Sequence, residues 1–315
     1  MAADDKRGRV VAGYANAAGV TWLDDAAEDA DTVVCIASAG KWIVAACVAV
    51  LVRQGDLDPS LPVRTLLPEL PDWAAPIRLH HLIHHTSGLP DRAVMDRGFA
   101  GEVSEWTNET VLGLLSTMPE PQAEPGTEFS YCTTGYVCLT ELVERAGGRP
   151  IAEVAQQHLF TPLGMASTQF WKGPGLHPPT VTAHPPWHPG VPAPQTGDGV
   201  WSTARDMLRW AEAMQTGALG PRLTATLRQP GKLRDNTMIP YAWGASILPG
   251  GETPAYAHPG SWPGCQTYVI TAPATGTAAV VIAYTDDSQK AETLGRKLAG
   301  VDQDPGSDPS PGRSS

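Results

Sequence analysis

The chain is poor in basic residues and in cysteine. Its 315 residues carry 22 Lys and Arg against 33 Asp and Glu, a formal net charge of −11. Because nucleic acid and anionic membranes attract positively charged surfaces, this balance predicts neither as a partner. The five cysteines are an odd number without metal-type spacing, so we expect buried thiols in a reduced compartment.

Targeting patterns are also lacking. The start, Met1 to Arg7, is polar and unlike a secretory signal. The longest apolar run, Trp42 to Val52, is bounded by Lys41 and Arg53 and is short for a membrane span. These features predict a cytoplasmic protein that does not use a membrane.

The distribution of patterns along the chain indicates the fold class. The apolar share of 42% suffices for a sizeable core. Alternating patterns predict strands at 9–14, 19–23, 256–258, 265–271 and 277–284, and the clearest helical patterns cover 42–52, 134–145, 203–214 and 287–298. We expect an α/β fold of the α+β type, an antiparallel sheet flanked by helices.

The same patterns suggest a division into domains. Residues 1–55 and 240–299 would form one discontinuous α/β domain, because the expected strands lie at both ends of the chain. Residues 56–239 would form a mostly helical insertion, and the Asp/Pro/Ser/Gly-rich stretch 300–315 a disordered tail. An active site would lie in the cleft between them, with the Pro-rich stretch 171–199 as its rim.

The most informative residues are Ser38 and Lys41, three positions apart at the head of the most apolar run. On a helix this spacing places both side chains on one face. A hydroxyl beside an amine that can take its proton is the minimal machinery of a serine acyltransferase. Lys41 must be neutral to act, so burial or a nearby cation must lower its pKa from about 10.4. The plainer alternatives are a helix cap for Ser38 and a surface lysine for Lys41.

Two further motifs follow in order, Tyr131 to Thr133 and His258 to Gly260. The ordered trio resembles the serine β-lactamase and penicillin-binding protein superfamily, whose motifs are S-x-x-K, Y-x-N and K-T-G or H-x-G. The tyrosine and histidine versions are similar to the class C branch, which holds esterases, D-aminopeptidases, carboxypeptidases and transacylases. Further stretches in family order are 51–58, 82–90, 162–165 and 201–207.

The resemblance implies roles for the matching residues. Ser38 would be the nucleophile, Lys41 and Tyr131 the groups that move its proton, and His258 a further catalytic group. The backbone N–H groups of Ser38 and Ser261 would form the oxyanion hole. Residues expected to bind substrate are Thr133, Gly260, Trp262 and Trp201. The chemistry needs neither a metal nor an organic cofactor.

Two positions depart from the family pattern. Thr133 replaces an asparagine and offers one hydroxyl instead of an amide, which puts recognition of a β-lactam or peptide acylamide in doubt. Thr134 could substitute, but it should point elsewhere. His258 replaces a lysine and, with an ordinary pKa near 6.5, is mostly neutral at pH 7. Both changes favour neutral esters or amides over penicillins. Tyr136 is the nearest rival to Tyr131, and His258 could be a plain strand residue.

A metal site is the other alternative that the histidines suggest. His80, His81, His84 and His85 form two i,i+4 pairs. However, the family match explains His85 to Gly88 as a structural turn, and no further ligand has suitable spacing. We therefore expect no functional metal there.

These observations favour a serine acyl-enzyme hydrolase or acyltransferase acting on an ester or amide of a small metabolite. A transacylase of secondary metabolism with an amine acceptor is one form of this hypothesis. The alternatives are a β-lactamase or D-Ala-D-Ala carboxypeptidase and, from another class, a catalytically silent ligand-binding module. The few residues before the first strand would leave a sheet edge bare, where a homodimer could form.

Overall fold

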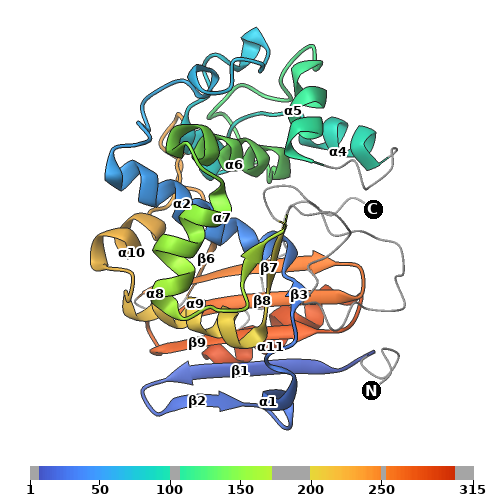
Figure 1. Cartoon of the computed structure of the whole chain (residues 1–315), viewed down its shortest axis with the longest axis vertical. Coiled ribbons are helices and arrows are strands. Elements are labelled where there is room, and N and C mark those ends of the chain that lie inside the picture. Colours follow the sequence, from blue (N-terminus) through green and yellow to red (C-terminus); the bar gives the residue numbers. More distant parts are fainter. Residues whose placement is uncertain (1–6, 100–106, 172–198, 250–252, 302–315) are drawn as a thin grey trace.

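One six-stranded antiparallel sheet organises the chain (Figure 1). The computed structural model describes residues 7–99, 107–171, 199–249 and 253–301. In spatial order the strands are β2 (Gly19–Trp22), β1 (Val10–Asn16), β9 (Thr277–Ala283), β8 (Cys265–Ala272), β7 (Ala255–Trp262) and β6 (Ser246–Leu248). The two ends of the chain thus share one sheet, and the expected α+β class with helices around an antiparallel sheet is confirmed.

Strand β7 is longer than the sequence pattern indicated, since it continues from His258 to Trp262. Trp262 pairs with Cys265 across a two-residue turn, so these two residues exchange both ladder hydrogen bonds. Hydrogen-bonded and non-hydrogen-bonded pairs alternate along the two strands, so Pro259 and Tyr268 form a non-hydrogen-bonded pair. The backbone nitrogen of Pro259 therefore faces away from β8. The missing N–H of the proline therefore does not interrupt the pairing.

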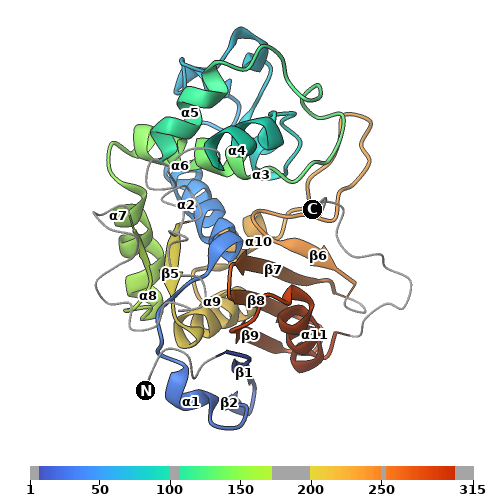
Figure 2. The ribbon, with the colours of Figure 1, turned by 90° about the vertical axis from the view of Figure 1, so that its right-hand side faces the viewer.

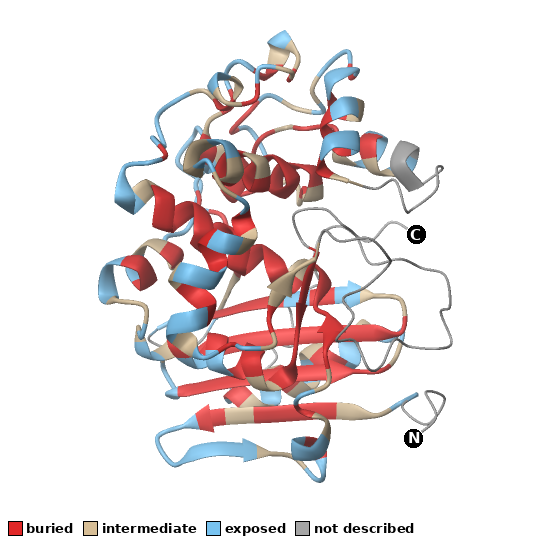
Figure 3. Cartoon of the chain, viewed as in Figure 1, coloured by how far each residue is buried: buried red, intermediate tan, exposed pale blue. Residues whose placement is uncertain are grey.

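A second, three-stranded sheet leads into the helix that follows. It consists of β3 (Val34–Cys35), β5 (Val200–Ser202) and β4 (Gln169–Phe170). After β3 the chain forms a 3₁₀ turn, η2 (Ala37–Ala39), and then the core helix α2 (Gly40–Gln54). Helix α2 is buried on every side along most of its length because its residues are apolar all round (Figure 3).

The length and composition of the 37–54 stretch would also suit a membrane span. Ala37–Gln54 has a mean hydropathy of 1.3, but 78% of it is buried inside the protein. This burial is typical of the core helix of a globular domain.

The remaining helices surround this core. They are α1 (Ala26–Asp29), α3 (Leu79–Ile83), α4 (Asp91–Phe99), α5 (Asn108–Ser116), α6 (Thr133–Gly147), α7 (Ile151–Ala155), α8 (Thr161–Leu163), α9 (Ala204–Thr216), α10 (Pro221–Leu227) and α11 (Ser288–Ala299), with 3₁₀ turns at Val63–Thr65 and Asp72–Ala74 and a π-turn at Gln156–Phe160. Helices α9 and α11 cover opposite faces of the large sheet (Figure 2). Helix α9 belongs to the stretch 56–239, for which the sequence suggested a separate helical insertion, yet it packs on the large sheet. The division into domains stays a prediction. The expected tail beyond 301 lies outside the described residues.

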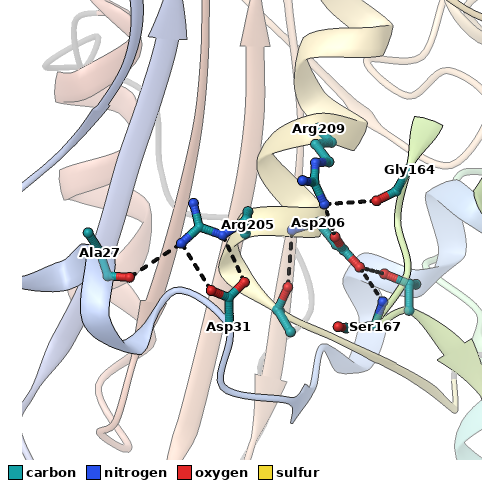
Figure 4. Close-up of polar contacts among 9 residues, drawn as sticks. Ala27, Asp31, Gly164, Ser167, Arg205, Asp206 and Arg209 are labelled. Carbon is teal, nitrogen blue, oxygen red and sulfur yellow. Dashed lines mark hydrogen bonds and ion pairs between the residues drawn. The ribbon is translucent and has the colours of Figure 1, made fainter.

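Charged side chains of α9 tie the small sheet to its surroundings (Figure 4). Arg205 forms a two-pronged ion pair with Asp31, at 2.8 and 3.0 Å, just before β3. Its guanidinium holds the pKa of the Asp31 carboxyl below its usual value. The buried carboxylate of Asp206 accepts from the Ser167 N–H at 2.8 Å and the Thr168 hydroxyl at 3.0 Å, just before β4. Helix α9 thus anchors the small sheet at both edges, at β3 through Arg205 and at β4 through Asp206.

The large sheet and the η2 turn meet at Gly260. A Cβ atom built on Gly260 would lie 2.0 Å from the Ile36 carbonyl oxygen and 3.3 Å from the Ala39 nitrogen. Only glycine therefore lets β7 approach the turn that carries Ser38 so closely.

We expect Gly260→Ala to lower the free energy of unfolding by about 1–3 kcal/mol, because the new methyl group would overlap backbone that cannot move without shifting β7 or η2. Gly113→Ala is the matched control. Gly113 lies in α5, where an added Cβ meets nothing within 4 Å, and there alanine should stabilise the helix slightly. Urea unfolding of both variants tests this, and equal stability of the Gly260→Ala protein and the parent would contradict the close packing.

Candidate active site

Ser38 and Lys41 are in direct contact. Lys41 Nζ lies 3.2 Å from Ser38 Oγ, within hydrogen-bond distance. Ser38 is half-buried in η2, and Lys41 has no exposed surface. The cap of α2 is Ala39, with no side-chain cap bond, so neither a helix cap nor a surface lysine describes the pair. The residue before Ser38, Ala37, has φ +46°, a strained conformation of the kind found at functional sites.

Tyr131 lies close to the amine of Lys41. The lysine nitrogen is 5.2 Å from the centre of the Tyr131 ring and 5.8 Å from that of Tyr136. The Tyr136 hydroxyl donates to the Ile83 carbonyl at 2.9 Å, and burial raises the pKa of this phenol. Tyr136 is therefore committed to the core, whereas Tyr131 is half-buried. This favours Tyr131 over its rival as the reactive phenol.

His258 completes the cluster from β7. Its ring centre is 6.1 Å from that of Tyr131, and only 1% of the residue is exposed. Nδ1 lies 2.6 Å from the Pro259 carbonyl, which can only accept, so Nδ1 carries a proton. Nε2 lies 3.1 Å from the hydroxyl of Tyr241, whose pKa is raised well above its usual value by burial. No motif drew attention to Tyr241, because its position becomes meaningful only through this contact.

The register of β7 determines which way the backbone N–H of Ser261 points. Ser261 pairs with Gln266, next to the hydrogen-bonded Trp262–Cys265 pair, so its N–H points away from β8. Among the described residues, β6 pairs only with the 255–257 part of that edge. The Gly260 contact with η2 brings this N–H near the turn that holds Ser38.

The two tryptophans singled out from the sequence share one small apolar cluster. Trp201, with 2% exposure, packs with Cys35 and Ala37 under the Ser38 turn. Trp262 is half-buried and packs against the same cluster from the end of β7. The expected rim at 171–199 falls almost entirely outside the described residues.

Thr133 begins α6 and is half-buried. Its neighbour Thr134 is fully buried and donates to Asp91 Oδ1 from both its hydroxyl, at 2.6 Å, and its backbone N–H, at 2.7 Å. As expected, Thr134 points elsewhere, because its hydroxyl joins α6 to α4. It therefore does not take the place of the family asparagine.

His81, His84 and the cysteines are structural in their contacts. Burial is the main cause that lowers the pKa of His81 to about 3 and of His84 to about 4, so both are neutral. In the part of the chain that the structure describes, no three His, Cys, Asp or Glu side chains are placed to hold a metal ion. All five cysteines are free and buried, as expected from the sequence.

Comparisons with known proteins agree with this arrangement. The chain is 33% identical to esterase EstB of Burkholderia gladioli over 54% of this chain and 45% of the esterase. It is 28% identical to penicillin-binding protein 4* of Bacillus subtilis over 75% of this chain and 57% of that protein. The chain thus spans about half the length of these curated relatives.

Solved structures share the fold. A penicillin-binding protein of Bacillus halodurans superposes with a TM-score of 0.75 at 21% identity, covering 93% of this chain and 96% of the other. D-amino acid amidase of Ochrobactrum anthropi SV3 superposes with a TM-score of 0.73 at 20% identity, covering 93% of both chains. Since the profile of the Beta-lactamase family matches residues 2–302, nearly the whole sequence, the chain belongs to the β-lactamase family.

Proposed function

We propose that this protein is a serine hydrolase that works through a covalent Ser38 acyl-enzyme. The contact between the fully buried Lys41 nitrogen and Ser38 Oγ is the observation that carries the proposal. A lysine buried beside a hydroxyl and two aromatic rings has little structural value that an apolar residue could not supply. A catalytic role explains why it is there.

In the proposed acylation step, Ser38 Oγ attacks the carbonyl carbon of an ester or amide. The hydroxyl proton passes to Lys41, acting as a neutral amine, or to Tyr131 as phenolate. The carbonyl oxygen becomes an oxyanion, which the backbone N–H groups of Ser38 and Ser261 would stabilise. Both donors belong to segments that the Gly260 contact holds together.

Collapse of this intermediate breaks the bond to the leaving group. Tyr131 would deliver the proton to the departing oxygen or nitrogen, and His258, 6.1 Å away between ring centres, would support it through the hydrogen-bonded Tyr241. Water then attacks the acyl-enzyme and releases the acid. An amine in place of water would give a transacylase, which is the finer form of this proposal.

Neutral esters or amides of small molecules are the proposed substrates. Thr133 offers one hydroxyl where an amide would bind an acylamide group, and His258 is not the fixed cation that a lysine would be. An esterase and a D-amino acid amidase among the similar proteins are in keeping with this class. A penicillin-recognising enzyme is the alternative that the penicillin-binding relatives support.

Replacement of Ser38 by alanine should abolish acylation. We expect at least about a 10³-fold loss of turnover and no covalent adduct, because the nucleophile is gone while Ser38 caps no helix. Intact-protein mass after brief incubation with a p-nitrophenyl ester and, separately, a fluorescent penicillin is the measurement. Ser167→Ala, half-buried but in the loop before β4, is the control and should acylate normally.

The preferred donor in that experiment separates the substrate classes. An adduct with the ester but not the penicillin supports the proposed class, and the reverse supports the penicillin-recognising alternative. Turnover that survives in Ser38→Ala would contradict the mechanism, and the absence of any adduct in the parent protein would favour the silent binding module.

Lys41→Arg and Lys41→Met should both lose activity without loss of folding. Arginine stays protonated and methionine carries no base, so we expect acylation to fall by about 10²–10⁴-fold in both. Methionine should leave the free energy of unfolding unchanged or raise it, because a buried polar group is replaced by an apolar one of similar size. Burst kinetics and urea unfolding test the pair, with the exposed Lys290→Met as control. A fully active Lys41→Met protein would rule out the base.

A further inference from the structure

His85, which the sequence placed in a structural turn, contacts the site directly. It is 1% exposed, and its ring centre lies 4.4 Å from that of Tyr131, 4.6 Å from Tyr241 and 5.0 Å from Tyr136. Its backbone has φ +55°, a conformation that non-glycine residues adopt rarely and that must be stabilised by the surroundings.

His85 also holds the backbone on both sides of Tyr131. The Ser130 N–H donates to the His85 carbonyl oxygen at 2.8 Å. The Cys132 N–H donates to His85 Nδ1 at 3.0 Å. Together with the ring contact, these bonds make three interactions between His85 and residues 130–132, the segment that carries the Tyr131 phenol.

The hydrogen bond from Cys132 requires a particular form of the imidazole. Nδ1 can accept only when it carries no proton, so the ring must be the neutral Nε2–H tautomer. Burial, followed by the charges of Lys41 and His258, lowers the pKa of His85 well below its ordinary value, which is consistent with this form. A protonated ring would lose the acceptor and place a positive charge close to the Lys41 nitrogen.

The alternative role, a metal or proton-transfer function, fits these contacts less well. Nδ1 is occupied by a backbone N–H, and in the described residues His85 belongs to no cluster that could hold a metal ion. Its neighbour His84 donates from Nδ1 to the His80 carbonyl at 3.0 Å and packs against Trp243, so it supports a different part of the molecule.

We propose that His85 is a positioning residue that fixes Tyr131 against Lys41 by accepting the Cys132 N–H and packing beneath the phenol ring. The proposal rests on the proposed function, in which Tyr131 moves the proton of Ser38. It gives the histidine of the His85–Gly88 turn a part in the reaction without contact to substrate. It also links β7 to Tyr131, because Tyr241 touches the His85 ring and binds His258.

Two substitutions of His85 distinguish the hydrogen bond to Cys132 from the ring packing against Tyr131, and a third substitution serves as control. His85→Asn keeps an acceptor atom at the δ1 position, and asparagine tolerates positive φ. His85→Phe keeps a ring but leaves the Cys132 N–H buried without its acceptor. His84→Phe is the matched change at the neighbouring buried histidine. Urea unfolding first establishes that each full-length variant is folded.

The first readout is hydrogen–deuterium exchange of the peptide that contains Cys132, which does not depend on activity. Exchange at this amide should be about tenfold faster or more in His85→Phe than in the parent, and near the parent rate in His85→Asn and His84→Phe. Parent-like protection in His85→Phe would overturn the proposed hold on the segment.

The second readout is the rate constant of acylation by a p-nitrophenyl ester. His85→Phe should acylate about 10- to 100-fold more slowly with little change in KM, because a misplaced proton-transfer group affects the step and not binding. His85→Asn should recover most of the rate, and His84→Phe should match the parent. Equal losses in His84→Phe and His85→Phe, or faster exchange without slower acylation, would overturn the positioning role. A parent protein that forms no Ser38 adduct would instead overturn the proposed function, and the exchange result would still decide whether His85 holds the segment.

Discussion

The burial of Lys41 is the constraint on which the rest of the site depends. An ammonium or amine removed from water must find polar or aromatic partners within the core. Ser38 supplies an oxygen at 3.2 Å, and the faces of Tyr131 and Tyr136 lie within 6 Å of the nitrogen. The apolar surroundings of α2 thus force polar and aromatic groups of two segments far apart in the chain, 38–41 and 131–136, to meet at one point. That gathering is the site.

Bringing these segments together costs backbone strain and close packing. Ala37 and His85 both have positive φ without being glycine, and they lie next to Ser38 and under Tyr131. Gly260 has no space for a side chain against the Ile36 carbonyl. Each of these positions lies next to a reactive side chain. The surrounding core stabilises them, and the Arg205–Asp31 ion pair fixes the segment before β3, which leads to Ser38.

Periodicity was enough to predict the core helix and five of the six strands of the large sheet, but it missed the short edge strand β6. The grouping of Tyr131 with Ser38 and Lys41 was expected from the family resemblance of the three motifs, not from periodicity. The extension of β7 past His258 was missed, since a proline interrupts a strand only when its nitrogen faces the neighbour, and that depends on the register. Tyr241 and His85 could not be assigned because their roles arise from contacts between segments far apart in the chain. Spacing alone gives no sign of such contacts.

The first turn of α6 shows how structure and specificity are coupled here. Cys132 gives its N–H to His85, and its sulfur accepts from the Gly135 N–H at 3.2 Å. Thr134 is bound to Asp91. Both neighbours of Thr133 are therefore used to hold the loop, so no adjacent side chain replaces the lost amide. Under the proposed mechanism, recognition falls to one hydroxyl, the edge of β7 and the half-buried face of Trp262. These groups suit the binding of a carbonyl group and an apolar acyl chain better than the binding of a peptide.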